Sequence, residues 1–449
     1  MVLTTLIATS AYAIEREVPI AAPIRFMDFV KYGRDKEVVR FQLGNGLQII
    51  LLQDMSVPLV TFQTWFGVGS RFDHRGKTGI AHLFEHLMFK GTKAHPHEVF
   101  DRLIEEAGAR NNAATWMDWT CYYEDLPADQ LELAVRLESD RMANLELTQA
   151  LLDAERDVVK NEREFRVDND PDGKLFEELF RMVFPSHPYG NPTLGSVSDL
   201  DSLTLDDCRA FHRTYYVPSN ATLVVVGAMK PEDALRIIAR AYGGIPAAPL
   251  PRAVPPPEAP QTAPRIQETS LAVATERVKM AWRAVAADHA DAAPLDVVTE
   301  ILFANESSRL DRILLEDKAI ASDIDGSLEA LALDGIFVAD AVMNEGESAR
   351  KAFDIVLEEI ARLGRDGPTE AELSRARNHL EAAFLRSLSS FGSRATQLGG
   401  YHLTAGDYRR MFFFVDRVRA VTAADVRRVV TTWLRPEAVC AVFGMPARH

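Results

Sequence analysis

The chain has 449 residues, of which 47% are hydrophobic and 26% charged, a composition typical of a globular protein with an ample core. Its 50 basic residues stand against 65 acidic ones, and the resulting net charge of −15 disfavours nucleic acid and anionic membranes as partners. No stretch approaches the roughly 20 apolar residues of a membrane-crossing helix, so no membrane span is expected.

The N-terminus, MVLTTLIATSAYAIEREV, is a short apolar run that ends in Ala11-Tyr12-Ala13. This A-x-A ending is typical of a signal-peptide cleavage site, although the basic residues that normally precede the apolar run are missing. We interpret residues 1–27 as a signal remnant followed by an N-terminal arm, which predicts a periplasmic or secreted protein.

Strands and helices are mixed along the rest of the chain. VRFQLGNGLQIILLQD alternates around Gly44-Asn45-Gly46, a strong hairpin signal, and LVTFQTWFGVGS alternates again. Residues 100–109 and the segments beginning at Gln130 and Thr148 have helical periodicity, while NAATWMDWTCYYEDL resembles a strand. This mixture predicts an α+β fold.

A proline-rich segment divides the chain nearly in half. Residues 246–264 hold eight of the 23 prolines, which favours an extended linker over residues 246–265. The two halves end alike, with a constant offset of 218 between Thr204 and Thr422, Asp207 and Asp425, and Pro218 and Pro436. We therefore expect two homologous domains, 28–245 and 266–449, each a mostly antiparallel sheet covered by helices, facing each other as a clamshell.

The stretch AHLFEHLMFKGT predicts a buried helix with three polar residues on one face. At 100° per residue, His82, Glu85 and His86 fall at 0°, 300° and 40° of the helical wheel. Thr78 is the expected N-cap and Gly91 the expected end. Burying imidazoles and a carboxylate is unfavourable unless they are paired, so something must lie against this face.

Two histidines four residues apart on a helix can chelate one cation, and zinc accepts imidazole nitrogens at roughly 2.0–2.1 Å. A catalytic zinc site keeps three protein ligands and one water, and Glu85 is placed to take a proton from that water. The order His-x-x-Glu-His is that of the inverzincin pattern. The alternative is a hydrogen-bonded His/Glu cluster inside a core.

A third ligand can come from the helix LLDAERDVVKNEREFRV. Glu155 and Glu162 are seven residues apart and so share one helical face, while Glu164 lies about 160° from Glu162. Spacing alone does not choose between these glutamates, and a solvated charged face is the alternative.

His82-x-x-Glu85-His86 followed 76 positions later by Glu162 resembles the pitrilysin/insulinase family of zinc peptidases, in particular its half-length, two-domain branch that includes the mitochondrial processing peptidase. FGVGSRFD before the motif and VVKNERE around Glu162 resemble the family as well. The resemblance implies one Zn²⁺ per chain, held by His82, His86 and Glu162, with Glu85 as general base. It makes Glu155 a supporting residue, a partner of a ligating histidine.

NNAATW resembles the family's N-A-x-T segment, an edge strand to which an extended peptide adds as a further strand. The resemblance implies that the substrate-binding residues are Asn112, Ala113, Ala114 and Thr115. From the residues alone, an interior strand remains an alternative.

One departure from the family concerns an arginine and a tyrosine in the second half. In LLEDKAIASDI these two positions fall on Leu315 and Ser322, so the second domain lacks the pair. We therefore predict a zinc-dependent endopeptidase subunit that cuts peptides or unfolded segments in an enclosed chamber and forms a hetero-oligomer with a homologous, Arg/Tyr-bearing partner. The alternatives are a non-catalytic structural or assembly subunit and a zinc-binding carrier.

Overall fold

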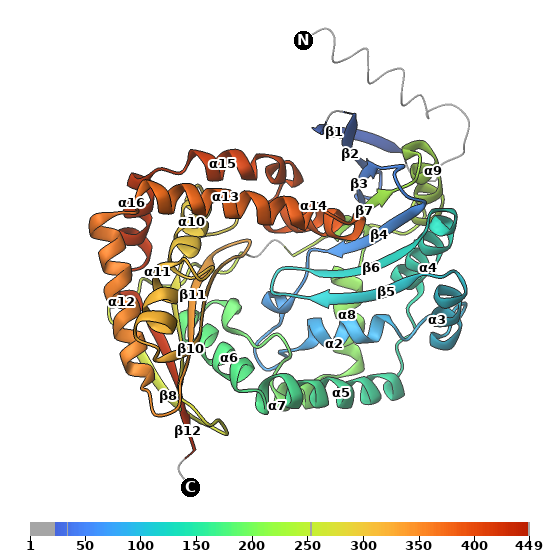
Figure 1. Cartoon of the computed structure of the whole chain (residues 1–449). Helices are drawn as coiled ribbons and strands as arrows, with labels where there is room; N and C mark the ends of the chain where they lie inside the picture. Colours follow the sequence, from blue (N-terminus) through green and yellow to red (C-terminus); the bar gives the residue numbers. More distant parts are fainter. Residues whose placement is uncertain (1–22, 34, 252–253, 448–449) are drawn as a thin grey trace.

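The computed structural model describes residues 23–33, 35–251 and 254–447. The signal-like segment at residues 1–22 lies outside the described residues. Two sheets stand side by side, the first to the right and the second to the left in Figure 1, with helices packed on their faces. The predicted α+β class is confirmed, but both sheets are mixed rather than purely antiparallel.

The first sheet has seven strands in the order β1-β2-β3-β7-β4-β6-β5. Its strands are β1 (Ile24–Tyr32), β2 (Lys36–Leu43), β3 (Gln48–Gln53), β4 (Leu59–Phe66), β5 (Arg110–Thr115), β6 (Thr120–Pro127) and β7 (Ala221–Gly227). The second sheet comprises β8 (Arg265–Leu271), β9 (Arg277–Arg283), β10 (Ala321–Ala330), β11 (Gly335–Met343) and β12 (Cys440–Pro446). The first sheet begins at Ile24, inside the range predicted as an arm.

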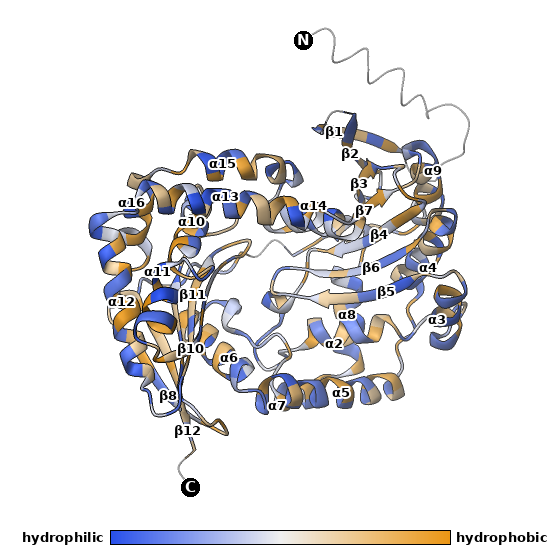
Figure 2. Cartoon of the chain, in the orientation of Figure 1, coloured by the Kyte–Doolittle hydropathy of each residue, from blue (hydrophilic) through white to orange (hydrophobic). Residues whose placement is uncertain are grey.

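The helices that follow β4 in the first half are α2 (Ile80–Met88), α3 (His97–Glu106), α4 (Leu131–Asn144), α5 (Gln149–Arg163), α6 (Pro171–Val183), α7 (Val197–Ser202), α8 (Leu205–Tyr215) and α9 (Pro231–Tyr242). Those of the second half are α10 (Ala292–Leu302), α11 (Arg309–Asp311), α12 (Ala349–Asp366), α13 (Glu370–Ser387), α14 (Phe391–Thr404), α15 (Phe414–Ala420) and α16 (Ala423–Trp433). The longer helices carry both hydrophobic and hydrophilic residues (Figure 2), as expected when one face packs and the other meets water.

The two sheets repeat one topology. The order β3-β7-β4-β6-β5 corresponds to β8-β12-β9-β11-β10, with the first pair parallel and the other pairs antiparallel in both sheets. The matched threonines Thr204 and Thr422 each form a capping box with the aspartate three residues on, at the starts of α8 and α16. The internal repeat seen in the sequence is therefore a repeat of structure, and it makes β10 the counterpart of β5.

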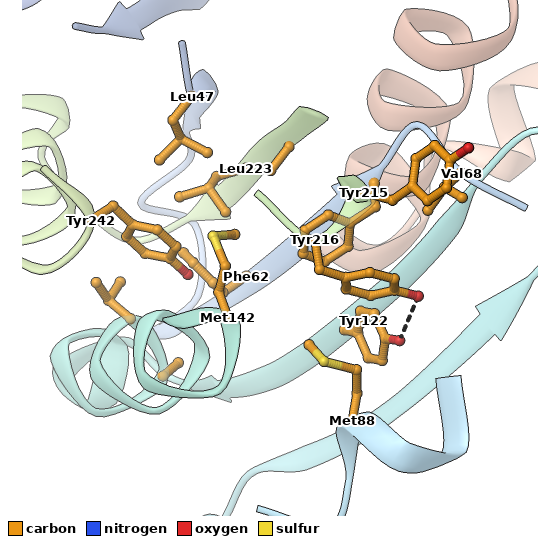
Figure 3. Close-up of a cluster of buried hydrophobic side chains, with 14 of the residues drawn as sticks. Leu47, Phe62, Val68, Met88, Tyr122, Met142, Tyr215, Tyr216, Leu223 and Tyr242 are labelled. Atoms are coloured by element: carbon orange, nitrogen blue, oxygen red, sulfur yellow. Dashed lines mark hydrogen bonds between the residues drawn. The ribbon is translucent and has the colours of Figure 1, made fainter. Parts of the chain in front are cut away.

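One large hydrophobic cluster holds α2, α4 and α8 on the first sheet. Figure 3 shows Met88, at the end of α2, in the same cluster as Tyr122 and Tyr216, whose hydroxyls lie 3.3 Å apart. Leu83, Phe84 and Leu87 of α2 are also buried in this cluster. The apolar face of α2 is thus fixed against the sheet, which leaves its polar face toward α5 and β5.

Each half covers the other half's sheet with one helix. Leu175 and Leu179 of α6 pack with Ala281 and Val442 of the second sheet. Conversely, α14 crosses to the first sheet, where a Cβ on Gly399 would lie 2.3 Å from the ring of Trp65. The predicted ranges 28–245 and 266–449 stay a prediction; β1 begins at Ile24 and β8 at Arg265, just before these ranges, and α6 and α14 each pack on the other half's sheet.

The proline-rich segment is anchored at Glu258 to the loop that follows α6. The buried carboxylate of Glu258 accepts hydrogen bonds from the backbone N–H groups of Ser186 and His187, each at 2.8 Å. Arg283 donates to the backbone carbonyl of Glu258 at 2.6 Å.

Among the described residues, no helix combines the length and apolarity needed to cross a membrane.

Candidate metal centre

Helix α2 begins differently from the sequence prediction. Its N-cap is Gly79 in the left-handed conformation, with φ of 87°, and Thr78 makes no cap hydrogen bond. Instead the buried carboxylate of Asp73 accepts from the backbone N–H groups of Gly79 and Ala81, at 2.7 and 3.2 Å. The predicted Thr78 cap is wrong because this threonine donates to the distant Asp199, and the carboxylate of Asp73, six residues before Gly79, satisfies the helix end.

The polar face of α2 meets α5, whose N-cap is Thr148. Nε2 of His86 lies 3.3 Å and Nε2 of His82 lies 3.7 Å from the same Oε2 atom of Glu162. Donor atoms of these three residues all lie within 4.8 Å of one another. The structure thus brings together the three residues that the family resemblance singled out as ligands.

The spacing of these atoms is compatible with one divalent ion shared by the three side chains. Ligands held tetrahedrally at roughly 2.0–2.1 Å from zinc lie about 3.4 Å apart, close to the 3.3 and 3.7 Å contacts. His82 is only 7% exposed, and its other ring nitrogen, Nδ1, is buried without a hydrogen-bond partner. Two imidazoles and one carboxylate are also a donor set typical of catalytic zinc sites.

Glu155 lies one layer behind these three residues. Its Oε2 is 3.6 Å from Nδ1 of His86, and its Oε1 is 2.8 Å from the ammonium of Lys90. Glu155 therefore faces the side of the His86 ring that points away from Glu162, while the Glu164 side chain is exposed and accepts a hydrogen bond from Asn169 at 3.4 Å. Of the three glutamates that spacing left open, Glu162 faces the histidines, Glu155 supports His86, and Glu164 does neither.

Glu85 joins α2 to the strand expected to bind substrate. The hydroxyl of Thr115 on β5 donates to Oε2 of Glu85 at 2.5 Å. In the described part of the chain, β5 pairs only with β6, so it is an edge strand and the interior-strand alternative is excluded. Asn112, Ala113, Ala114 and Thr115 lie along this free edge, beside the carboxylate of Glu85.

Burial and neighbouring charges set the protonation of the cluster. Burial, with the nearby His86, lowers the pKa of His82 to about 4. Burial alone would lower the pKa of His86 too, but the carboxylates of Glu155 and Glu162 outweigh it and raise that pKa to about 9. Burial raises the pKa of Glu85 above its usual value, the direction expected of a general base that works near neutral pH.

Hydrogen bonding from His86, more than any other contact, lowers the pKa of Glu162. For Glu155, burial acts to raise the pKa, but contacts with His86 and Lys90 outweigh it and lower the pKa. Both carboxylates are therefore held ionised, the state in which a carboxylate binds a cation.

Arg166 was missed in the sequence analysis. It lies in the π-helical turn Glu164–Asp168 that follows α5, and its Nε is 3.0 Å from Oε1 of Glu162. The i, i+4 spacing of Glu162 and Arg166 was the available signal. The two oxygens of Glu162 are thus divided between Arg166 and the two histidines.

The positions expected for an arginine and a tyrosine lie in the second half. Leu315 packs on the core of the second sheet, and Ser322, near the start of β10, donates to the backbone carbonyl of Val342 at 3.3 Å. Neither residue carries a cation or a phenol.

Two family models match consecutive parts of the chain. Residues 48–197, which contain the whole candidate centre, match the model described as "Insulinase (Peptidase family M16)". Residues 202–380 match the model described as "Peptidase M16 inactive domain".

Full-length relatives are similar too. The zinc protease PqqE of Helicobacter pylori is 28% identical over 414 residues, covering 90% of this chain and 92% of that protein. The mitochondrial-processing peptidase subunit beta of Lentinula edodes is 26% identical over 422 residues, covering 90% and 89%. The crystal structure of a protease from Helicobacter pylori superposes with a TM-score of 0.85 at 27% identity, covering 91% of this chain and 99% of that one.

Proposed function

Because this chain belongs to the peptidase M16 (insulinase) family, we propose that it is the zinc-bearing subunit of a metalloendopeptidase that cuts peptides or unfolded segments. One observation carries the proposal. Donor atoms of His82, His86 and Glu162 converge within 4.8 Å of one another, next to an edge strand that is hydrogen-bonded to Glu85.

His82, His86 and Glu162 would hold the ion. A bound zinc ion supplies Lewis acidity at the scissile carbonyl. Glu155 orients the ring of His86 from behind and compensates the charge of Lys90, so that the imidazole presents Nε2 to the centre. Arg166 holds the second oxygen of Glu162 and leaves Oε2 for the metal.

Glu85 is the general base. It is buried, its pKa is raised by that burial, and the hydroxyl of Thr115 fixes one carboxylate oxygen beside the substrate strand. Its role is to remove a proton from the attacking water and then deliver that proton to the leaving amine. A peptide that pairs with the free edge of β5 would run directly past this carboxylate.

A partner subunit completes the centre. The second half offers Leu315 and Ser322 where an arginine and a tyrosine were expected, so a donor for the developing oxyanion must come from elsewhere. A relative is itself named as a subunit, the mitochondrial-processing peptidase subunit beta.

The test is cleavage of an internally quenched peptide by the purified chain, alone and mixed with a homologous subunit that carries the Arg/Tyr pair. We expect chelator-sensitive cleavage that rises at least tenfold with the partner. Full activity of the chain alone would refute the partner requirement. Bound zinc without turnover, with or without the partner, would favour the non-catalytic subunit. The carrier would be favoured if the bound zinc exchanges freely with zinc in solution and the Glu85→Gln substitution changes nothing.

For location, we propose the periplasm or the exterior, which fractionation of cells expressing the full chain would test.

A further inference from the structure

A cavity of about 720 Å³ lies on the first half, between the loop that follows α2, the segment that joins α4 to α5, and α8. Of the described residues that line it, none belongs to the candidate metal centre or to β5. The volume falls within the roughly 300–1,000 Å³ of small-molecule sites. The cavity is therefore large enough for a ligand of its own, separate from a peptide at the metal centre.

Three basic side chains line this cavity, Lys93 from the loop and Arg209 and Arg213 from α8. Within the described part of the chain, the side chains of Lys93 and Arg213 have no hydrogen-bond or ion-pair partner. Arg209 has only long contacts, 3.6 Å to Asp206 and 3.4 Å to the backbone carbonyl of Leu147. Arg209 and Arg213 are also one helical turn apart, a spacing at which like charges repel each other, and an anion between them would relieve this repulsion.

The other ionisable groups of the lining leave these cations uncompensated. Asp140 is already bound, because its carboxylate accepts from the hydroxyl of Thr92 at 2.5 Å and lies 2.7 Å from Nδ1 of His95. Burial lowers the pKa of His212 to about 4, so this imidazole is uncharged at neutral pH. Glu146 forms no ion pair with any described residue, the three cations included. In a chain with a net charge of −15, this cavity thus has basic groups in excess.

The walls of the cavity are held together by the protein itself. Thr92, in the loop after α2, forms an antiparallel bridge with Leu145, and the backbone N–H of Glu146 donates to the carbonyl of Gly91 at 3.1 Å. Gly91 has a φ of 83°, and a Cβ on it would lie 2.4 Å from a backbone carbonyl oxygen of the same loop, so this turn requires glycine. Lys93 and Glu146 therefore extend from fixed backbone, and binding needs little ordering of the walls.

We propose that this cavity binds a small soluble sugar phosphate. Lys93, Arg209 and Arg213 contact the phosphate oxygens, since a guanidinium can donate two parallel hydrogen bonds to a phosphate and an ammonium adds a compact charge. The free carboxylate of Glu146 accepts from the hydroxyl groups of the sugar. The net charge of the chain disfavours nucleic acid and anionic membranes, so the phosphate comes from a small molecule. The site is independent of the proposed peptidase function.

Equilibrium titration of the zinc-loaded chain tests the proposal. Calorimetry compares fructose 1,6-bisphosphate with hexane-1,6-diol bisphosphate, which carries two phosphates and no free hydroxyl. We expect one saturable site per chain for the sugar, and binding of the analogue that is weaker by at least about threefold. If neither compound binds saturably, the proposal is overturned. If the analogue binds as tightly as the sugar, phosphate alone is recognised and the assignment to a sugar phosphate is wrong.

Variants assign the binding to this cavity. Arg213→Met and Lys93→Met should each weaken binding of fructose 1,6-bisphosphate by at least about tenfold, because each removes a charged donor to phosphate. Glu146→Ala should abolish the difference between the two bisphosphates, and a difference that persists would refute the role of Glu146.

Arg136→Met is the matched control. Arg136 on α4 is exposed like Arg213 and its side chain also has no partner among the described residues, but it does not line the cavity. We expect this variant to bind within about twofold of the wild type, since a distant exposed charge contributes little. Unchanged binding by Arg213→Met, or an equal loss in Arg136→Met, would refute the location. Cleavage is not measured, so a failure of the proposed peptidase function leaves this result unaffected.

Discussion

Replacement of Glu155 by glutamine tests whether the layer behind the histidines controls metal binding. The carboxylate of Glu155 contacts the ammonium of Lys90 at 2.8 Å and Nδ1 of His86 at 3.6 Å. Glutamine keeps the shape but removes the negative charge. The His86 ring then loses its anionic partner, and Lys90 is left as an uncompensated cation near a site for another cation.

Loss of such an outer partner weakens metal binding about 10- to 100-fold, or roughly 1.4–2.8 kcal/mol. Because Lys90 adds repulsion here, we expect the upper part of this range. Substituting Lys90→Met together with Glu155→Gln should recover part of the loss, since the unpaired cation is gone while the His86 ring still lacks its acceptor.

The assay is competition for zinc with a chromophoric chelator at fixed pH and ionic strength. Asp153→Asn is the matched control, because Asp153 is on the same helix but is 54% exposed and, among the residues that the structure describes, pairs only with neighbours on that helix. We expect this control to stay within twofold of the wild type. If Glu155→Gln also stays within twofold, or if both variants lose affinity equally, the supporting role of Glu155 is wrong.

Three further predictions concern catalysis, the contact between the halves, and pH. Glu85→Gln should keep stoichiometric zinc, measured by metal analysis, and lose at least 100-fold in peptide cleavage; retained turnover would remove Glu85 as the base. Tyr189→Phe should lower the free energy of unfolding in urea by about 3 kcal/mol, because the buried hydroxyl donates to Asp118 at 2.9 Å and accepts a backbone N–H from the second half at 3.0 Å. Tyr216→Phe, which removes a hydroxyl whose partners, Tyr122 at 3.3 Å and Thr120, are both uncharged, is the control and should cost about 1 kcal/mol. Contacts with an arginine and the cap of α13 outweigh burial and lower the pKa of Glu372 to about 2, against roughly 4.3 in the unfolded chain. Its stabilisation is therefore complete above about pH 4.3 and is lost as the pH falls toward 2, so Glu372→Gln should cost on the order of 1 kcal/mol at pH 6, allowing for solvent screening, and nothing near pH 2. If Glu372→Gln lowers the free energy of unfolding in urea equally at pH 6 and near pH 2, this explanation is wrong.

Sequence patterns within one segment predicted the structural features that depend on that segment alone. The shared face of His82, Glu85 and His86 followed from helical periodicity, and the match of Thr204 and Asp207 to Thr422 and Asp425 followed from a constant sequence offset, although the sequence analysis did not predict the capping boxes that these pairs form. Hydrogen bonds between segments distant in sequence were not predictable in this way. Thr78 was expected to cap α2 because it stands next to the helix, but its hydroxyl donates to Asp199, 121 residues further along the chain, and Asp73 takes its place at the helix end.

The choice among acidic residues shows the same limit. A helical wheel placed Glu155 and Glu162 on one face, but only the approach of α5 to α2 shows which of them faces the two imidazoles. The polar contact of Arg166 with Glu162 has a common surface spacing and carries no mark of function by itself.

The exchange of α6 and α14 has a consequence for how the protein is made. A ribosome releases the first half long before α14 has been synthesised, so the face of the first sheet around Trp65 stays bare until nearly 400 residues have emerged. By contrast, α6 has already been synthesised when the strands of the second sheet emerge. Folding of the new chain therefore ends with a docking step that completes both hydrophobic cores. If the chain is cut at the proline-rich segment, each fragment alone should aggregate, and the two fragments should associate when they are mixed.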